Sequence, residues 1–172
     1  MNYEIVPGRL IHVGRMSRAM RDDAAATIGA FGFDPKRALR DAVIGSHYCR
    51  AAVVDGRPVA MWGLRGALLS DHAMVWLVLS KDVTGMPRAI ITEARREMAA
   101  FGEQYDELAT TVLPEDDAAI RFASFLGFHD RHDEEHDEMT RKERAEDMRH
   151  NPRHRIPVRD GYVIALGWHG AA

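Results

Sequence analysis

Hydrophobic residues recur along this chain at two spacings, and the spacing predicts the type of element at each place. Ala119, Phe122, Phe125 and Leu126 fall three and four positions apart, which is the spacing of one face of an α-helix. Residues 73–79 are instead continuously apolar, as expected of a strand that is covered on both faces. The pattern therefore predicts helices packed on a buried sheet.

Turn and cap residues divide the rest of the chain into further elements. Asp55, Gly56, Arg57 and Pro58 form the clearest turn, which predicts a hairpin between the strands on either side. Ser17 is expected to cap the first helix. The predicted strands are 10–13, 51–54, 59–64, 73–79, 107–112, 128–131 and 162–166, and the predicted helices are 17–30, 34–44, 87–101 and 116–126. This order predicts an α/β fold, a mixed central sheet flanked by helices on both faces.

Composition narrows the classes of function. With 172 residues, of which 46% are hydrophobic and 28% charged, and a formal charge of -3, the chain predicts one globular domain rather than a basic nucleic-acid binder or an acidic disordered protein. Cys49 is the single cysteine, and we expect a small apolar residue there rather than a nucleophile. We recognise no signal peptide and no apolar run of roughly 18–20 residues, which favours a cytoplasmic protein without a membrane span.

The predicted helix that ends at Leu126-Gly127-Phe128 carries a resemblance. Its polar start at Asp116, its aromatic face and its Leu-Gly-Phe ending resemble the closing signature of the GNAT superfamily of N-acetyltransferases. The order of predicted elements is similar to that superfamily from about residue 10 to residue 131. The resemblance implies a GNAT-like domain with a mixed, mostly antiparallel central sheet.

Two further segments are similar to GNAT-like proteins of tailed bacteriophages. They are the sequence DPKRALR at residues 34–40 and the Pro-Arg helix start at Pro87 and Arg88. This resemblance implies a protein of the host cytoplasm that can be incorporated into a phage particle.

The chain changes character after the GNAT-like domain, which we assign to residues 1–132. Residues 133–172 form a charged extension that ends in the predicted strand 162–166. That strand either completes the sheet of its own domain or pairs with another chain. We expect a protein partner, or a second copy of this chain, to bind through residues 133–172.

The resemblance also implies an acetyl-coenzyme A site after the central strand. The backbone of three strand residues would align the pantetheine arm, and residues at the next helix N-terminus would hold the diphosphate. These residues are Val78, Leu79 and Ser80 for the arm, and Gly85, Met86 and Arg88 for the diphosphate.

Substitutions within this pattern predict a degenerate site. We align Gly85 with the glycine of the diphosphate-binding turn in GNAT enzymes. In this alignment Asp82 takes the place of a basic or amide residue, and Pro87 removes one N–H from the diphosphate cradle. On the last helix, Ala123 stands where many GNAT enzymes have the tyrosine that protonates the leaving thiolate.

Two functions therefore stay open. The first is a GNAT-fold protein with a degenerate site that works through protein contact, in a virion or during assembly. The second is an active acetyl-coenzyme A-dependent N-acetyltransferase of a small-molecule or protein amine, because positioning alone can support transfer. Asp71 and His72 are the candidate general bases, although a polar loop explains both residues as well.

Two other activities receive less support. His129, His132 and His136 have a spacing that suits metal ligands on one helical face, but a strand at 128–131 would break that geometry, so we expect no metal site. The basic residues between 141 and 159 are mixed with acids and lack interleaved aromatics, so nucleic-acid binding is not favoured.

Overall fold

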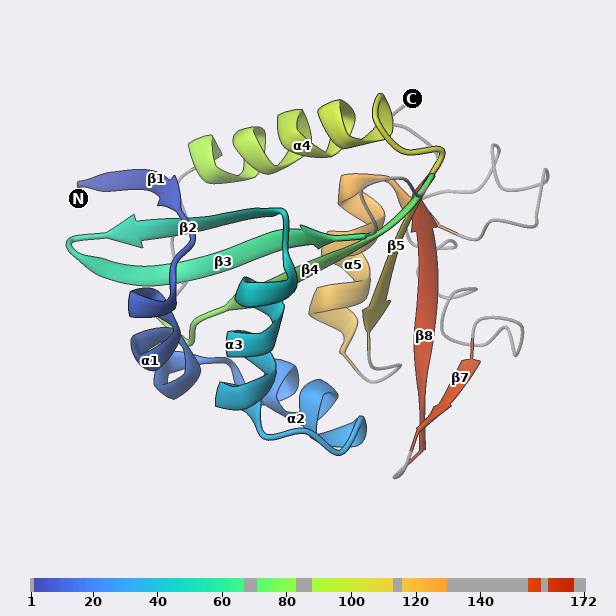
Figure 1. Cartoon of the computed structure of the whole chain (residues 1–172), viewed down its shortest axis with the longest axis horizontal. Helices are drawn as coiled ribbons and strands as arrows, with labels where there is room; N and C mark the ends of the chain where they lie inside the picture. The colour runs from blue at the N-terminus through green and yellow to red at the C-terminus, as the bar shows by residue number, and fades with distance from the viewer. Residues whose placement is uncertain are drawn as a thin grey trace.

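The computed structural model describes residues 2–66, 71–82, 88–112, 116–129, 155–158 and 161–168. Its strands form one sheet in the order β1-β2-β3-β4-β5-β8-β6, with β7 paired to β8 (Figure 1). The strands are β1 (Tyr3–Pro7), β2 (Tyr48–Val54), β3 (Arg57–Arg65), β4 (His72–Leu79), β5 (Glu107–Val112), β6 (Phe128–His129), β7 (Arg155–Val158) and β8 (Gly161–Trp168). The pairing of β4 with β5 is parallel, and the other pairings between these strands are antiparallel.

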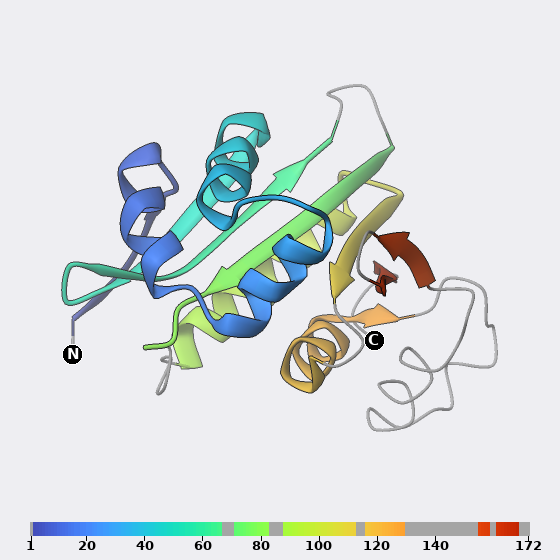
Figure 2. The same ribbon diagram turned by 90° about the horizontal axis from the view of Figure 1, so that it is seen from below.

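Helices cover both faces of this sheet. The helices are α1 (Leu10–Ala19), α2 (Asp22–Ala30), α3 (Pro35–Gly45), α4 (Arg88–Gly102) and α5 (Asp117–Leu126). Figure 2 shows α1, α2 and α3 on one face, while α4 runs along the other. The α/β class and the mixed, mostly antiparallel sheet are therefore confirmed.

Separate apolar clusters hold the two helical layers to the sheet. On the side of α4 and α5, Met98 and Ile120 pack with Leu108 of β5. On the side of α1 and α3, Met16 and Leu39 are buried together with other residues that include Met61 of β3 and Val78 of β4. Along β4, Val75 lies in the first cluster and Val78 in the second, because residues an odd number of positions apart on a strand point to opposite faces.

Local sequence signals account for several element boundaries. The Asp34 side chain accepts a hydrogen bond from the backbone N–H of Arg37 at 2.8 Å, so it caps α3. Asp116 caps α5 in the same way through the N–H of Ala119, at 2.9 Å. Gly127 ends α5 with a φ of 99°, in the left-handed region that glycine adopts without strain. The predicted helices 34–44 and 116–126 are confirmed to within one residue at each end.

The β2–β3 hairpin is confirmed at its predicted turn. Asp55 and Gly56 have φ values of 47° and 76°, as a two-residue hairpin turn with positive φ at both positions requires. The turn brings Val54 opposite Arg57, and the two strands then pair as far as Tyr48 and Leu64.

The prediction for residues 10–13 is wrong. They begin helix α1, and the first strand lies earlier, at Tyr3–Pro7. The buried residues Val13 and Met16 lie three positions apart and face the core from one side of the helix. Ser17 lies inside this helix, where its hydroxyl donates to the carbonyl oxygen of Gly14 at 3.5 Å, so it does not cap a helix. The short apolar run 10–13 suits either structure, and packing under the sheet decides for the helix.

The predicted strand 162–166 lies within β8. This strand pairs antiparallel with β5, from Val112 opposite Ile164 to Leu108 opposite Trp168. Its first residues, from Gly161 to Ile164, pair with β7, and Ile164 pairs with both strands. Figure 1 shows the β7–β8 hairpin extending past the end of β5. Of the predicted strand 128–131, β6 covers the first two residues, and residues 130–131 lie outside the described part.

Candidate functional site

Strands β4 and β5 separate toward their carboxyl ends. They pair over three residues only, from His72 opposite Glu107 to Met74 opposite Ala109. Beyond this point residues 75–79 of β4 and 110–112 of β5 diverge, and Figure 2 shows the sheet opening between them. In open α/β sheets, ligands bind in such an opening at the carboxyl ends of the strands. This opening is the candidate site.

The carboxyl end of β4 carries the residues expected to align a pantetheine arm. Val78 is buried on the side of α1, and Leu79 packs with the cluster that includes Ile90 of α4. Ser80 is 1% exposed, and its backbone N–H donates to the carbonyl oxygen of Val59 on β3 at 2.9 Å. Because polar backbone groups of successive strand residues point to opposite edges, those of residues 79 and 81 point away from β3.

The junction between α1 and α2 occupies that outer edge of β4. Met20 forms an antiparallel bridge with Ser80. Beside it, the N–H of Arg21 donates to the carbonyl oxygen of Leu79 at 3.0 Å, and the N–H of Lys81 donates to the carbonyl oxygen of Ala19 at 2.7 Å. The backbone groups that would align a pantetheine arm at Leu79 are thus already paired within the chain.

Ion pairs reinforce this junction. The ammonium of Lys81 lies 2.7 Å from a carboxylate oxygen of Asp22. The guanidinium of Arg21 forms a two-pronged pair with the carboxylate of Asp23, whose backbone carbonyl accepts from the hydroxyl of Thr27 at 3.0 Å. The pair of Lys81 with Asp22 joins the start of α2 to the end of β4, whereas the pair of Arg21 with Asp23 is local to the junction.

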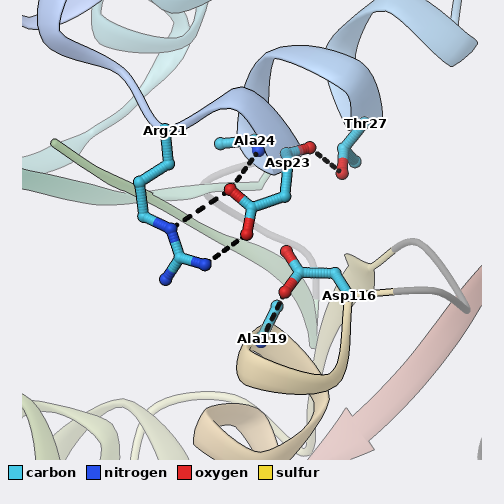
Figure 3. A network of polar contacts seen from close by, with 6 residues as sticks. All are labelled: Arg21, Asp23, Ala24, Thr27, Asp116 and Ala119. Carbon is cyan, nitrogen blue, oxygen red and sulfur yellow. Dashed lines mark hydrogen bonds and ion pairs between the residues drawn. The ribbon is translucent and has the colours of Figure 1, made fainter. Parts of the chain in front are cut away.

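Acidic side chains gather at the mouth of the opening. Figure 3 shows the carboxylates of Asp23 and Asp116 directed toward each other from the starts of α2 and α5. One oxygen of Asp23 accepts from the N–H of Ala24 at 3.2 Å, and Asp116 caps α5 through Ala119. Carboxylates at helix N-termini stabilise those helices. The guanidinium of Arg21 offsets the charge of Asp23, while Asp116 adds a carboxylate beside the opening.

The other residues that the sequence analysis considered for catalysis lie on α5 and at the start of β4. Ala123 lies on α5, is 6% exposed and packs in the core cluster with Val75 of β4. Asp71 and His72 lie at the closed end of the opening, where the N–H of Glu107 donates to the carbonyl oxygen of Asp71 at 3.0 Å. The His72 ring contacts the Glu107 carboxylate. Because a strand rises about 3.3 Å per residue, this end lies roughly 23 Å along β4 from Leu79.

The predicted diphosphate residues are described only in part. Arg88 begins α4 and is exposed, and its carbonyl oxygen accepts from the hydroxyl of Thr92 at 3.0 Å. Gly85, Met86 and Pro87 lie outside the described residues. The assignment of Gly85, Met86 and Arg88 to the diphosphate stays a prediction.

A buried carboxylate on α4 is one feature that the sequence did not indicate. Glu97 is 8% exposed, and one of its oxygens accepts from the hydroxyl of Tyr48 at 2.5 Å, while the other accepts from the indole N–H of Trp62. The guanidinium of Arg50 lies 3.7 Å from the same carboxylate. Burial, and next the hydrogen bond to Glu97, raise the pKa of Tyr48 to about 12. This cluster ties α4 to β2 and β3.

Cysteine and metal chemistry receive no support from the described part of the chain. Burial raises the pKa of the Cys49 thiol to about 11, so the thiol stays protonated at neutral pH. Among the described residues, no three His, Cys, Asp or Glu side chains are grouped to hold a metal ion. His132 and His136 lie outside this part. No described helix has the length and apolar character to cross a membrane.

Three solved acetyltransferase structures resemble nearly the whole chain. The GNAT domain of S. lividans PAT matches with a TM-score of 0.59 at 16% identity, over 96% of this chain and 89% of that domain. The ribosomal-protein-S18-alanine N-acetyltransferase from Escherichia coli matches with a TM-score of 0.58 at 18% identity, over 99% of this chain and 97% of that one. PaiA N-acetyltransferase from Thermoplasma acidophilum, solved in complex with coenzyme A, matches with a TM-score of 0.54 at 13% identity, over 96% and 98%.

These similarities show the fold. The chain has the GNAT acetyltransferase fold. No protein-family model and no curated protein matches the sequence.

Proposed function

We propose that this chain keeps the acetyltransferase scaffold with a degenerate coenzyme site, and that it works through protein contact. The observation that carries the proposal is the pairing of residues 19–21 with residues 79–81. A pantetheine arm aligned on the outer edge of β4 would have to displace this pairing. Displacement would also separate the ion pair of Lys81 with Asp22.

The site residues support the same proposal. Ala123 stands in the position of the expected proton donor and is buried without a titratable group. Asp82 follows β4 as an exposed carboxylate in the position of the expected basic or amide residue. Asp116 adds a further carboxylate at the mouth. Electrostatic repulsion then opposes the coenzyme diphosphate.

The contact surface belongs to the C-terminal extension in this proposal. Strand β7 pairs with β8, and their hairpin extends past the end of β5 (Figure 1). A projecting two-stranded ribbon offers backbone donors and acceptors that can pair with another chain. Such a contact suits a virion or assembly component, which is the role that the resemblance to bacteriophage proteins implies.

A second function is favoured by the opening itself. Strands β4 and β5 are no longer paired with each other after Met74 and Ala109, which is where a ligand would lie between the strands in this alternative. In this alternative the chain is an N-acetyltransferase of a small-molecule or protein amine, with acetyl-coenzyme A bound along β4 and at Arg88. Asp71 and His72 remain the candidate bases of that reaction.

Calorimetric titration with acetyl-coenzyme A separates the two functions. The degenerate-site proposal predicts no binding up to millimolar coenzyme. Micromolar binding that weakens on Arg88→Ala would overturn it and support the enzyme. Arg96→Ala is the matched control, because Arg96 lies on the same helix and pairs with Glu93 on the exposed surface.

A further inference from the structure

A cavity of about 690 Å³ lies between α1 and the β2–β3 hairpin, apart from the β4–β5 opening. Its lining residues come from α1, the hairpin and the segment that follows β4, and they include Arg15, Arg18, Arg57 and Asp82. A second cavity of about 540 Å³ between β1 and α1 shares Arg15, Gly56 and Pro58 with the first. The two together form a groove along α1.

Three guanidinium groups converge on the larger cavity. Arg15 and Arg18 are three positions apart on α1 and therefore lie on one helix face. Arg57 follows the hairpin turn, and a guanidinium N–H of Arg15 donates to the carbonyl oxygen of Gly56 at 3.1 Å, which holds helix and turn together. Within the described part of the chain, none of the three arginines forms an ion pair.

Two carboxylates, Asp55 and Asp82, also line the cavity, and against the three guanidinium groups they leave a net positive charge there. Asp55 accepts a hydrogen bond from the N–H of Asn2 at 3.0 Å, so its carboxylate is engaged with the start of β1. Asp82 is exposed after the end of β4. The remaining wall includes the apolar side chains of Ala19, Val54, Pro58 and Val59. The cavity therefore combines an apolar wall with three guanidinium groups that form no ion pair among the described residues.

We propose that this cavity binds a phosphate-bearing small molecule through Arg15, Arg18 and Arg57. A guanidinium offers a planar fork of N–H donors that matches the oxygens of a phosphate, and such charge-assisted bonds are strong. The volume falls within the range of about 300–1,000 Å³ that is common for small-ligand sites. This site goes beyond the proposed function, because it uses neither the edge of β4 nor the opening beside β5.

Calorimetric titration with inorganic pyrophosphate at near-physiological salt tests the site. We expect saturable binding that weakens by roughly tenfold or more in Arg18→Gln and in Arg57→Gln, because each variant removes one charged donor. Arg40→Gln is the matched control, since Arg40 is exposed on α3 outside both cavities, and its affinity should equal that of the wild type. Asp82→Asn should tighten binding by removing a negative charge.

Competition with coenzyme A then identifies the source of the phosphate. If saturating coenzyme A displaces pyrophosphate and Arg57→Gln weakens both, the coenzyme's own phosphates occupy the cavity. If pyrophosphate binds unchanged beside coenzyme A, or coenzyme A does not bind at all, the ligand is a separate phosphorylated molecule. Both results support the site. Absence of pyrophosphate binding up to millimolar concentration, or an equal loss in Arg40→Gln, would overturn it.

Discussion

The backbone N–H of Arg21 donates to the carbonyl oxygen of Leu79 at 3.0 Å, which joins the turn between two helices to the open edge of β4. The contact lies at the strand residues where the GNAT resemblance expects a pantetheine arm. Since the fold is that of an acetyltransferase, this local pairing bears directly on function. The edge of β4 at Leu79 is thereby closed by the chain itself.

Replacement of Arg21 by proline should weaken this pairing selectively. Arg21 has a φ of -61° and Met20 a ψ of 141°, so proline fits the backbone while it removes the N–H donor. Arg21→Ala is the matched control, because it also loses the ion pair with Asp23 but keeps the N–H. We expect chemical denaturation to show Arg21→Pro less stable than Arg21→Ala by about 1 kcal/mol. Equal stability would show that the bond contributes nothing.

The carboxylate of Glu97 should be important for stability. Glu97→Gln places an amide NH₂ against the hydroxyl of Tyr48 or the indole N–H of Trp62, and it leaves Arg50 without its charge partner. We expect a loss of about 2–4 kcal/mol in the free energy of unfolding. The control is Glu103→Gln, at an exposed position just after α4, where the change should be close to zero. Similar values for both variants would contradict the account of the cluster.

Tyr48 should make stability fall at high pH. Its pKa of about 12 in the folded protein lies above the ordinary value of about 10, so the folded state holds the phenolic proton more tightly. The resulting stabilisation is complete below about pH 10 and is lost as the pH rises toward 12. The free energies of unfolding of the wild type and Tyr48→Phe should therefore converge as the pH rises over this interval. A difference in the free energy of unfolding that stays constant with pH would contradict the raised pKa of Tyr48.

Installing the missing tyrosine should not create an enzyme. Ala123 is 6% exposed and packs in the core cluster with Val75 and Ile120, so Ala123→Tyr overpacks this region. We expect a loss of about 1–3 kcal/mol in stability and no acetyl transfer in a thiol-release assay. Transfer by this variant would show that the coenzyme does reach the opening.

Local signals in the sequence were sufficient to predict many of the helices and strands. The caps Asp34 and Asp116, the turn at Asp55 and Gly56, and the stop at Gly127 act through neighbouring backbone atoms, so they can be read without the fold. The mixed, mostly antiparallel sheet and the GNAT fold were expected from the order of predicted elements and from the resemblance that residues 116–128 carry.

Features built by distant residues could not be predicted in this way. The bridge between Met20 and Ser80 joins residues sixty positions apart, and it breaks the region predicted as one helix into α1 and α2. Glu97 looks like any charged residue of an amphipathic helix until β2 and β3 bring Tyr48 and Trp62 to it. The cavity arginines likewise come from a helix and a hairpin that only the fold places together.

The amide resonances of Arg21 and Lys81 give the most direct test of the central claim, that the edge of β4 is closed by the chain itself. Nuclear magnetic resonance with an acetyl-coenzyme A titration would follow them. The account predicts that both amides exchange slowly with solvent and keep their chemical shifts up to millimolar coenzyme. Large shifts of both amides at micromolar coenzyme, with loss of their protection, would contradict it.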